Sequence, residues 1–482
     1  MIENQQMYRN DEAVSAGSSP SHHGLMLGLV LTGMFVNLLN VSVINVMLPT
    51  LMDRFTVSVA LAQWASTGFL LLTGIVIALV PFLVKRYRYK TLFVAAMAAL
   101  VVGSIVCAAA PGFAWLLVGR LIQAIGYGIL LPLAMILVLA VTPPERLGSA
   151  MGVLGVAMML APAVGPTIAG VVITVFSWRV LFAAMAVIGT AVGVAALVGF
   201  SYRQPTSRPR PDLAGIALVA GGLSALLYGA SRAGQAGWAD PVVLIALITG
   251  LGLLAGFVVV ELRGDHPLLD VRVLADRVFA RTVAITMVLQ MAFYGGLILM
   301  PLYFQKVLGL SGLQTGLLVL PGSAVIGLLG LVAGKVYDRI GLKPLAVAGG
   351  LVMAGAALAL ARLSPASHWW YALVAYTVFA VGVAAISTPI TTAAFATVAA
   401  SAQSDAATVQ NMLRQIAGAM GTAVIMSTVS MAAASATTAG QTPALATAHG
   451  VSVAFELTAA LALVTAVAAA VWTTGRRPTA GH

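Results

Sequence analysis

The sequence predicts an all-α membrane protein with fourteen transmembrane helices and both termini in the cytoplasm. Of its 482 residues, 60% are hydrophobic and only 8% are charged, whereas soluble domains carry about 25% charged residues. Stretches of about 18 apolar residues are long enough to span a bilayer. Fourteen such stretches follow one another along the chain, and the only three that carry a charge contain Arg120, Arg414 and Glu456.

The basic residues orient these spans. An even number of spans puts both ends of the chain on one side of the membrane. If that side is the cytoplasm, most of the 25 Lys and Arg residues fall in cytoplasmic loops, where membrane proteins concentrate them. The net charge of +11 is then explained by orientation and by contact with anionic lipid, and it does not indicate nucleic-acid binding.

An internal repeat divides the chain into two related halves. Residues 58–91 and 311–344 align at a constant offset of 253, which pairs Arg86 with Arg339. Two six-span halves are the plan of many secondary transporters, whose substrate site lies between the halves near the membrane midplane. We therefore expect a disordered cytoplasmic tail (1–24), an N-terminal six-helix half (25–200), a cytoplasmic linker (201–212), a two-helix insert (213–261), a cytoplasmic loop (262–281), a C-terminal six-helix half (282–474) and a cytoplasmic tail (475–482).

A short motif follows one span of the second half. Gly334, Asp338, Arg339, Gly341 and Lys343 form the pattern G-x-x-x-D-R-x-G-x-K. It resembles the signature loop of the major facilitator superfamily. A carboxylate at a span end can pair with a neighbouring helix end and hold the cytoplasmic side in one state. The alternative is an ordinary basic loop that only orients the spans.

The first-half copy of this motif departs from the pattern. Arg86 matches, and we include it in the predicted cytoplasmic latch. Lys85 replaces the acid, while Pro81 and Arg88 replace glycines. This copy therefore gives little support for a latch of its own.

The fourth span places an arginine inside the membrane. Arg120, Gln123 and Gly126 resemble the superfamily motif R-x-x-Q-x-x-G. A buried charge in lipid is costly and usually faces a protein cavity and a partner. The resemblance implies a role for Arg120 in coupling or gating, and the alternative is a structural, hydrogen-bonded arginine.

Further motifs narrow the resemblance to the 14-span drug:proton antiporters. The fifth span resembles an antiporter motif, which favours export over uptake, and similar matches extend over about residues 25–475. The resemblance implies the major facilitator fold and proton-coupled multidrug efflux, and we expect a monomer of a bacterial plasma membrane that needs no cofactor. The residues that match the antiporter motif are Pro162, Gly165, Pro166 and Gly170.

The coupling group departs from the family pattern. Related first spans carry an acid where this chain has Asn40, and an amide cannot exchange a proton. Glu456 lies within a span, about one and a half turns from its predicted outer end, and is our leading coupling candidate. A carboxylate satisfied by neighbours is the alternative, and Asp53 and Asp405, at span ends, are weaker coupling candidates. Arg414 can pair with Glu456, with substrate anions or with helix carbonyls.

A few polar and aromatic residues are candidates for the cavity lining, although each can equally be a packing residue. With Arg120 and Arg414 buried and one carboxylate nearby, the cavity is expected to be neutral to positive, which suits neutral or anionic substrates better than lipophilic cations. The candidates are Asn37, Gln123, Tyr228, Gln290 and Tyr294.

The sequence thus favours an exporter of amphipathic small molecules such as drugs or antibiotics, with protons as coupling ion. One alternative is a dedicated exporter of a single metabolite. Another is a membrane sensor or assembly partner without transport activity, because Asn40 and Lys85 replace acids. An enzyme is not predicted: the histidines lie in tails or loops and Cys107 is the only cysteine, so no metal site or nucleophile–base pair is expected.

Overall fold

The computed structural model describes residues 20–57, 59–143, 146–200, 206, 212–264 and 269–472, and these residues form helices joined by short connections. The first six long helices are α2 (Pro20–Phe55), α3 (Val59–Arg86), α4 (Tyr89–Ala109), α5 (Phe113–Val141), α6 (Leu147–Val175) and α7 (Arg179–Gly199). Then follow α8 (Leu213–Ala236), α9 (Pro241–Arg263) and the short η2 (Val271–Ala275). The remainder comprises α10 (Arg277–Leu302), η3 (Tyr303–Val307), α11 (Gly312–Ile340), α12 (Leu342–Leu360), α13 (Trp369–Phe395), η4 (Ala400–Ala402), α14 (Gln403–Thr438) and α15 (Pro443–Trp472).

Thirteen of the helices in the described residues are long and apolar enough to cross a membrane. The sequence predicted fourteen spans. Helix α6, with 29 residues, is not among the thirteen, because the stretch of it that was assessed is the apolar Leu147–Met158. The all-helical architecture is confirmed, and the number of spans stays a prediction.

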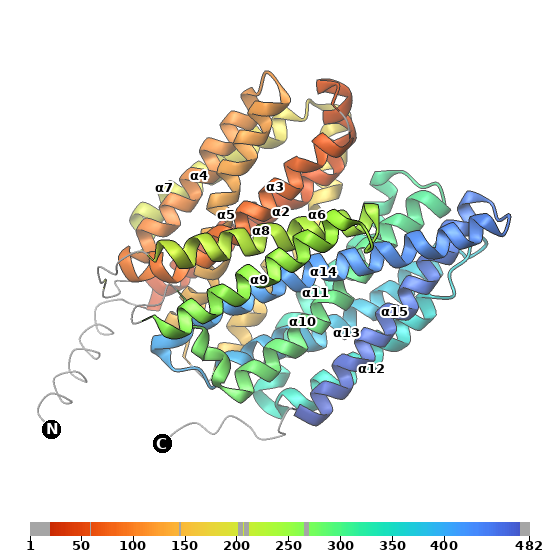
Figure 1. Ribbon diagram of the computed structural model, residues 1–482. Coiled ribbons are helices and arrows are strands. Elements are labelled where there is room, and N and C mark those ends of the chain that lie inside the picture. The colour runs from red at the N-terminus through yellow and green to blue at the C-terminus, as the bar shows by residue number, and fades with distance from the viewer. Residues whose placement is uncertain are drawn as a thin grey trace, which may run out of the picture.

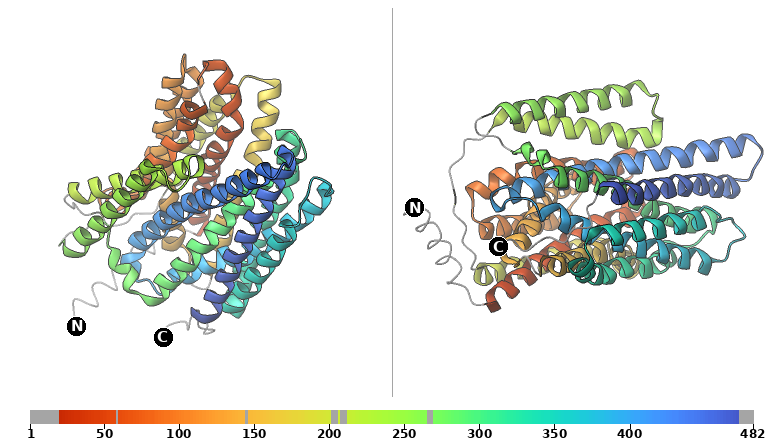
Figure 2. Two further views of the ribbon diagram at one scale, coloured as in Figure 1. Left: turned by 45° about the vertical axis from the view of Figure 1, so that its right-hand side comes forward. Right: turned by 90° about the horizontal axis from the view of Figure 1, so that it is seen from below.

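The helices form two bundles and an added pair. Helices α2–α7 make one bundle and α10–α15 the other, while α8 and α9 pack side by side across them (Figure 1). Seen from below, the α8–α9 pair forms a layer of its own (Figure 2). Helix α8 contacts α3 of the first bundle and α14 of the second, so the pair bridges the two.

Element bounds differ from the predicted ones at several points. Helix α2 begins at Pro20, inside the predicted tail, and proline suits the first turn of a helix because its missing N–H has no helical partner there. The predicted loop 262–281 contains the end of α9, η2 and the start of α10. The predicted tails at 1–19 and 475–482 lie outside the described residues.

Local sequence explains the helix ends. Asp240 caps α9 by accepting from the N–H groups of Val242 and Val243, and it pairs with Arg232 at 3.2 Å. The hydrogen bond from Arg232 holds the pKa of the Asp240 carboxyl below its usual range. Helix α11 begins with a capping box between Ser311 and Gln314. These caps fix where the connections between spans begin.

Large apolar cores hold the bundles together. One cluster gathers buried side chains mainly from α2–α6, and another gathers those of α10–α15. By contrast, α9 turns large apolar side chains outward, including Ile245, Ile248 and Leu251. In a membrane, such a surface faces lipid, and it explains why both faces of these helices are apolar.

Candidate functional site: a central cavity closed at one end

A cavity of about 110 Å³ lies between the two bundles. A second cavity of about 50 Å³ shares four of its residues and adds the hydroxyls of Thr286, Ser387, Thr388 and Thr391. Pockets for drug-sized molecules usually measure about 300–1,000 Å³, so the cavity is contracted in this state. The larger cavity is lined by Leu38, Tyr127, Leu131, Met158, Gln290, Phe293, Tyr294, Leu297, Ser323, Ile326, Tyr376, Asn411, Arg414 and Gln415.

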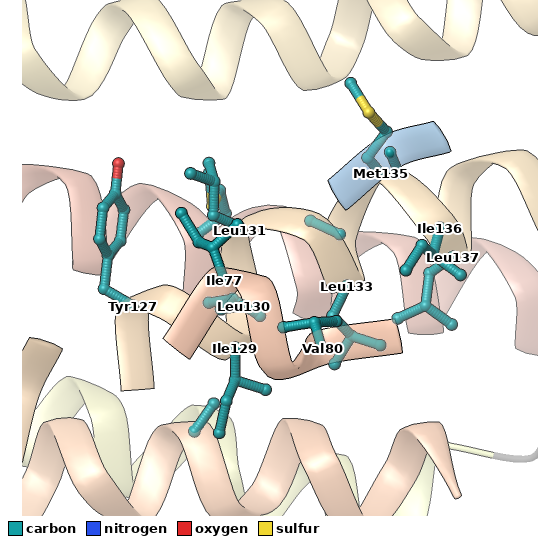
Figure 3. Packing of buried hydrophobic residues seen from close by; sticks show 14 of the residues in the cluster. Ile77, Val80, Tyr127, Ile129, Leu130, Leu131, Leu133, Met135, Ile136 and Leu137 are labelled. Carbon is teal, nitrogen blue, oxygen red and sulfur yellow. The ribbon is translucent and has the colours of Figure 1, made fainter. Parts of the chain in front are cut away.

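One face of α5 lines both cavities. Tyr127, Leu131 and Met135 recur every four residues and point the same way, whereas Ile129 points to the opposite side (Figure 3). Tyr127 and Leu131 line the larger cavity, and Met135 lines the smaller one. The helical period of 3.6 residues puts this spacing on one face.

The two halves contribute different chemistry to the larger cavity. The N-terminal half supplies three apolar side chains and the ring of Tyr127. The C-terminal half supplies amides, hydroxyls and the one cation, Arg414. Asn411, Arg414 and Gln415 share one face of α14, because residues three and four apart are neighbours on a helix. The C-terminal half also contributes the apolar Phe293, Leu297 and Ile326. Apolar groups therefore line both sides of the cavity, whereas the amides and the positive charge lie on the C-terminal side.

Arg120 lies fully buried beside this region but lines neither cavity. Its Nη1 donates to Asn40 Oδ1 at 3.0 Å and to Gln123 Oε1 at 2.9 Å, and its Nε donates to the Ala65 carbonyl at 3.2 Å. The guanidinium also lies 4.3 Å from the centre of the Phe69 ring. Asn40 thus serves as a neutral hydrogen-bond acceptor for the buried arginine.

Arg414 and Glu456, which the sequence offered as one of three possible pairings of Arg414, form no ion pair in the structure. Arg414 lines both cavities, whereas the side chain of Glu456 is exposed on α15. The helix begins at Pro443, thirteen residues before Glu456, so the carboxylate lies nearer the middle of its helix than the sequence predicted. Among the described residues no carboxylate pairs with Arg414.

The predicted cavity residues fall into two groups. Gln290 and Tyr294 line the larger cavity. Asn37 and Gln123 are buried elsewhere: Asn37 donates to the Gly33 carbonyl at 2.9 Å, and Gln123 donates to Ser104 at 2.9 Å. Tyr228 belongs to α8 and lines neither cavity, so these three are packing or network residues in this state.

One ion pair joins the two halves at the end predicted to be cytoplasmic. Lys85 Nζ at the end of α3 lies 3.6 Å from Asp405 Oδ2 in the first turn of α14. The other oxygen of the Asp405 carboxylate accepts the backbone N–H of Asp270 at 3.2 Å, which ties the loop before α10 to the same point. The Asp405 side chain is only 5% exposed. Lys85, the residue that departs from the motif, therefore forms a contact between the halves.

The second-half motif also lies between the halves. A Cβ added to Gly148 of α6 would collide with the Asp338 carboxylate and would lie 2.7 Å from the Gly334 carbonyl oxygen. Four residues on, a Cβ added to Gly152 would lie 3.0 Å from the Gly330 carbonyl oxygen of α11. Glycines let these backbones approach, and Asp338 thereby comes to lie beside the first turn of α6. Of the other motif residues, Gly341 ends α11 with φ +79°, Lys343 is half-buried, and Arg339 and Arg86 are exposed.

Replacing Gly334 by valine is expected to reduce transport by about tenfold or more, because overpacking a tight contact costs about 1–3 kcal/mol and would push α6 and α11 apart. Initial transport rates in membrane vesicles would measure the effect. The matched control is Gly355→Val, since a Cβ at Gly355 of α12 meets no atom within 4 Å. Equal rates for both variants would show that the α6–α11 crossing does not control transport.

The antiporter motif lies on α6, where it packs against α2. A Cβ on Gly165 would overlap the hydroxyl of Ser42, which donates to the Leu39 carbonyl at 3.0 Å. Pro162, Pro166 and Gly170 lie in the same helix, and each proline removes one helical hydrogen bond. The motif therefore combines a tight contact with α2 and missing helical hydrogen bonds in one helix, α6.

Sequence reasoning undervalued Lys85 and Asp405. A signal was present in the repeat: Lys85 and Asp338 occupy equivalent places in the two halves with opposite charge. Because Lys85 is positive where Asp338 is negative, the partner of Lys85 on the neighbouring helix is expected to be an acid. Asp405 lies in the first turn of α14, which contacts α3. The sequence did not show that α3 and α14 meet.

Two six-helix bundles with a contracted cavity between them define a multi-pass membrane transporter rather than an enzyme. The family model of the Major Facilitator Superfamily matches residues 30–422. The chain belongs to this superfamily and is a multi-pass protein of the plasma membrane.

Relatives and solved structures agree with this assignment. The chain is 30% identical over 409 residues to the lincomycin resistance protein LmrB of Bacillus subtilis, covering 84% of each chain. It is also 30% identical over 391 residues to the multidrug resistance protein B homolog of Mycobacterium tuberculosis, covering 80% of this chain and 72% of that one. The crystal structure of the human organic anion transporter MFSD10 superposes with a TM-score of 0.66 at 16% identity, over 94% of this chain and all of the other, and shows the shared fold.

Proposed function

We propose that this protein is a secondary active exporter of amphipathic small molecules, driven by protons, in which the two halves rock about the central cavity. The observation that carries the proposal is the cavity of about 110 Å³ lined by both halves. Next to it, the predicted cytoplasmic end is closed by the α3–α14 and α6–α11 contacts. Closure at one end of a central site is what alternating access requires.

Export rather than uptake is supported by two further observations. The relatives named above are resistance proteins, and a membrane transporter that confers drug resistance does so by removing the drug. The antiporter motif on α6 points the same way. The driving force is adequate, because one charge crossing 100 mV is worth about 2.3 kcal/mol.

The coupling carboxylate is part of the proposal. Asn40 cannot exchange a proton. Glu456, exposed on α15, remains the candidate that the sequence favours. Asp405 is the rival candidate, because it is buried between the halves and would change its surroundings when they separate.

Accumulation of lincomycin and of dyes in energised inverted vesicles tests the function. We expect accumulation that a proton uncoupler abolishes and that Glu456→Gln abolishes as well. Loss in Asp405→Asn but not in Glu456→Gln would assign coupling to Asp405. Export of a single compound from a broad panel would indicate a dedicated exporter, and absence of any transport would favour the sensor or assembly role.

A further inference from the structure

Among the residues that the structure describes, no carboxylate lines the central cavity to balance its positive charge. Arg414 is the one cation among the described residues that line the two cavities, and the other ionisable lining groups are Tyr127, Tyr294 and Tyr376. The nearest acid along α14 is Asp405, nine residues earlier, or about 14 Å along the helix axis. That carboxylate is already paired with Lys85 at 3.6 Å.

We propose that the cavity takes amphipathic anions, with Arg414 as the group that binds the ligand's carboxylate or sulfonate; this inference rests on the exporter function proposed above. A guanidinium binds such groups through charge-assisted hydrogen bonds in a planar, two-point geometry. Because no carboxylate in the described part of the chain pairs with Arg414, its guanidinium is left for the ligand. A lipophilic cation would meet a like charge here and no compensating acid.

The remaining lining fits the two ends of such a ligand. Gln415 and Asn411 lie on the same face of α14 as Arg414, and Tyr294 and Gln290 face them from α10. These groups offer hydrogen bonds to an anionic head. Across the cavity, the N-terminal half offers Leu38, Leu131 and Met158, which suit an apolar body. The ligand is thus expected to lie with its head on the C-terminal half.

Fluorescence polarisation on the purified full chain in lipid nanodiscs tests the inference with two dyes that share a xanthene ring system. Fluorescein is anionic at neutral pH and rhodamine 123 is cationic. We expect saturable binding of fluorescein and much weaker binding of rhodamine 123. Arg414→Gln should weaken fluorescein binding by about 10- to 100-fold, the usual effect of losing a charged hydrogen-bond partner. Arg414→Lys should restore part of it.

The matched control is Arg277→Gln, which removes an exposed arginine at the start of α10. It should leave fluorescein binding unchanged, and the thermal stability of each variant shows whether it is folded. Tighter binding of rhodamine 123, binding of neither dye, or equal fluorescein binding by wild type and a folded Arg414→Gln variant would overturn the inference. Proton-driven transport of any compound by the same purified protein, reconstituted in liposomes, would leave the exporter function standing in each case.

Discussion

Replacing Lys85 by methionine is expected to open the cytoplasmic end of the protein. The substitution leaves the Asp405 carboxylate, 5% exposed, without its cationic partner between the two halves. Removing one member of a buried ion pair is more damaging than removing both, because a lone charge stays buried. The Lys85 side chain is 39% exposed, so solvent screens part of the interaction. Because the pair is neither fully exposed nor fully buried, we expect the equilibrium between the closed and open states to shift about tenfold toward the open state.

A cysteine in the cavity measures this opening. Ser387 lines the smaller cavity, and the natural Cys107 is fully buried, so Ser387→Cys provides a reporter with little background. An impermeant maleimide added to inverted vesicles reaches the cavity only when the cytoplasmic end is open. Labelling should rise about tenfold in Lys85→Met.

Two further variants make the result specific. Arg88→Met removes an exposed charge three residues along the chain that is not part of the predicted latch, and it should leave labelling low. Adding Asp405→Asn to Lys85→Met should restore part of the closure, because an amide oxygen can still accept the Asp270 N–H. If Lys85→Met labels no faster than wild type, the ion pair does not hold the end shut. Faster labelling only from the opposite face would reverse the predicted orientation.

Replacing Arg120 by methionine is expected to destabilise the N-terminal half. The side chain volume is largely kept, but the oxygens of Asn40, Gln123 and Ala65 lose their donor inside a buried region. An unsatisfied buried acceptor costs about 1–3 kcal/mol, so we expect a loss of about 3 kcal/mol or more. The apparent melting temperature of the purified protein in detergent would show it.

Variants of Arg120 and Asn40 test whether the lost hydrogen bonds cause the destabilisation. Arg120→Lys keeps the charge but not the planar fork, so it should lie between wild type and Arg120→Met. Asn40→Asp gives the guanidinium a carboxylate 3.0 Å from Nη1 and should raise the melting temperature. An unchanged melting temperature in Arg120→Met would show that the acceptors find other partners, and the arginine would then have to be explained by transport.

The sequence predicted the all-helical membrane fold well, because apolar stretches long enough to span a bilayer can be read directly from hydropathy. It also predicted the family from motifs such as Gly334 to Lys343. It predicted less well which side chains face the cavity. Asn37, Gln123 and Tyr228 lie outside the two cavity linings in this state, while Gln290 and Tyr294 lie within them. In a membrane helix the lipid-facing and protein-facing surfaces are both apolar, so hydrophobic periodicity carries little information about orientation.

Contacts between the halves were the other gap. The sequence placed Lys85, Asp338 and Asp405 at span ends but did not show which ends meet. Such pairing depends on how α3 and α14, or α6 and α11, cross after both bundles have formed. Opposite charges at equivalent positions of a repeat indicate that the two positions have different partners. Which partners these are follows only from the contacts between the helices.

The position of α8 bears on the route by which molecules leave or enter the lipid. In a protein built of two bundles, a molecule can pass between the lipid and the cavity along the seams where the bundles meet. Here one seam lies at α3–α14 and the other at α6–α11. Helix α8 covers the first: Leu223 and Leu227 lie beside Gly74 of α3, and Ser427 of α14 donates to the Ala233 carbonyl at 3.3 Å. An amphipath dissolved in the membrane therefore has no direct path to the cavity through the α3–α14 seam in this state.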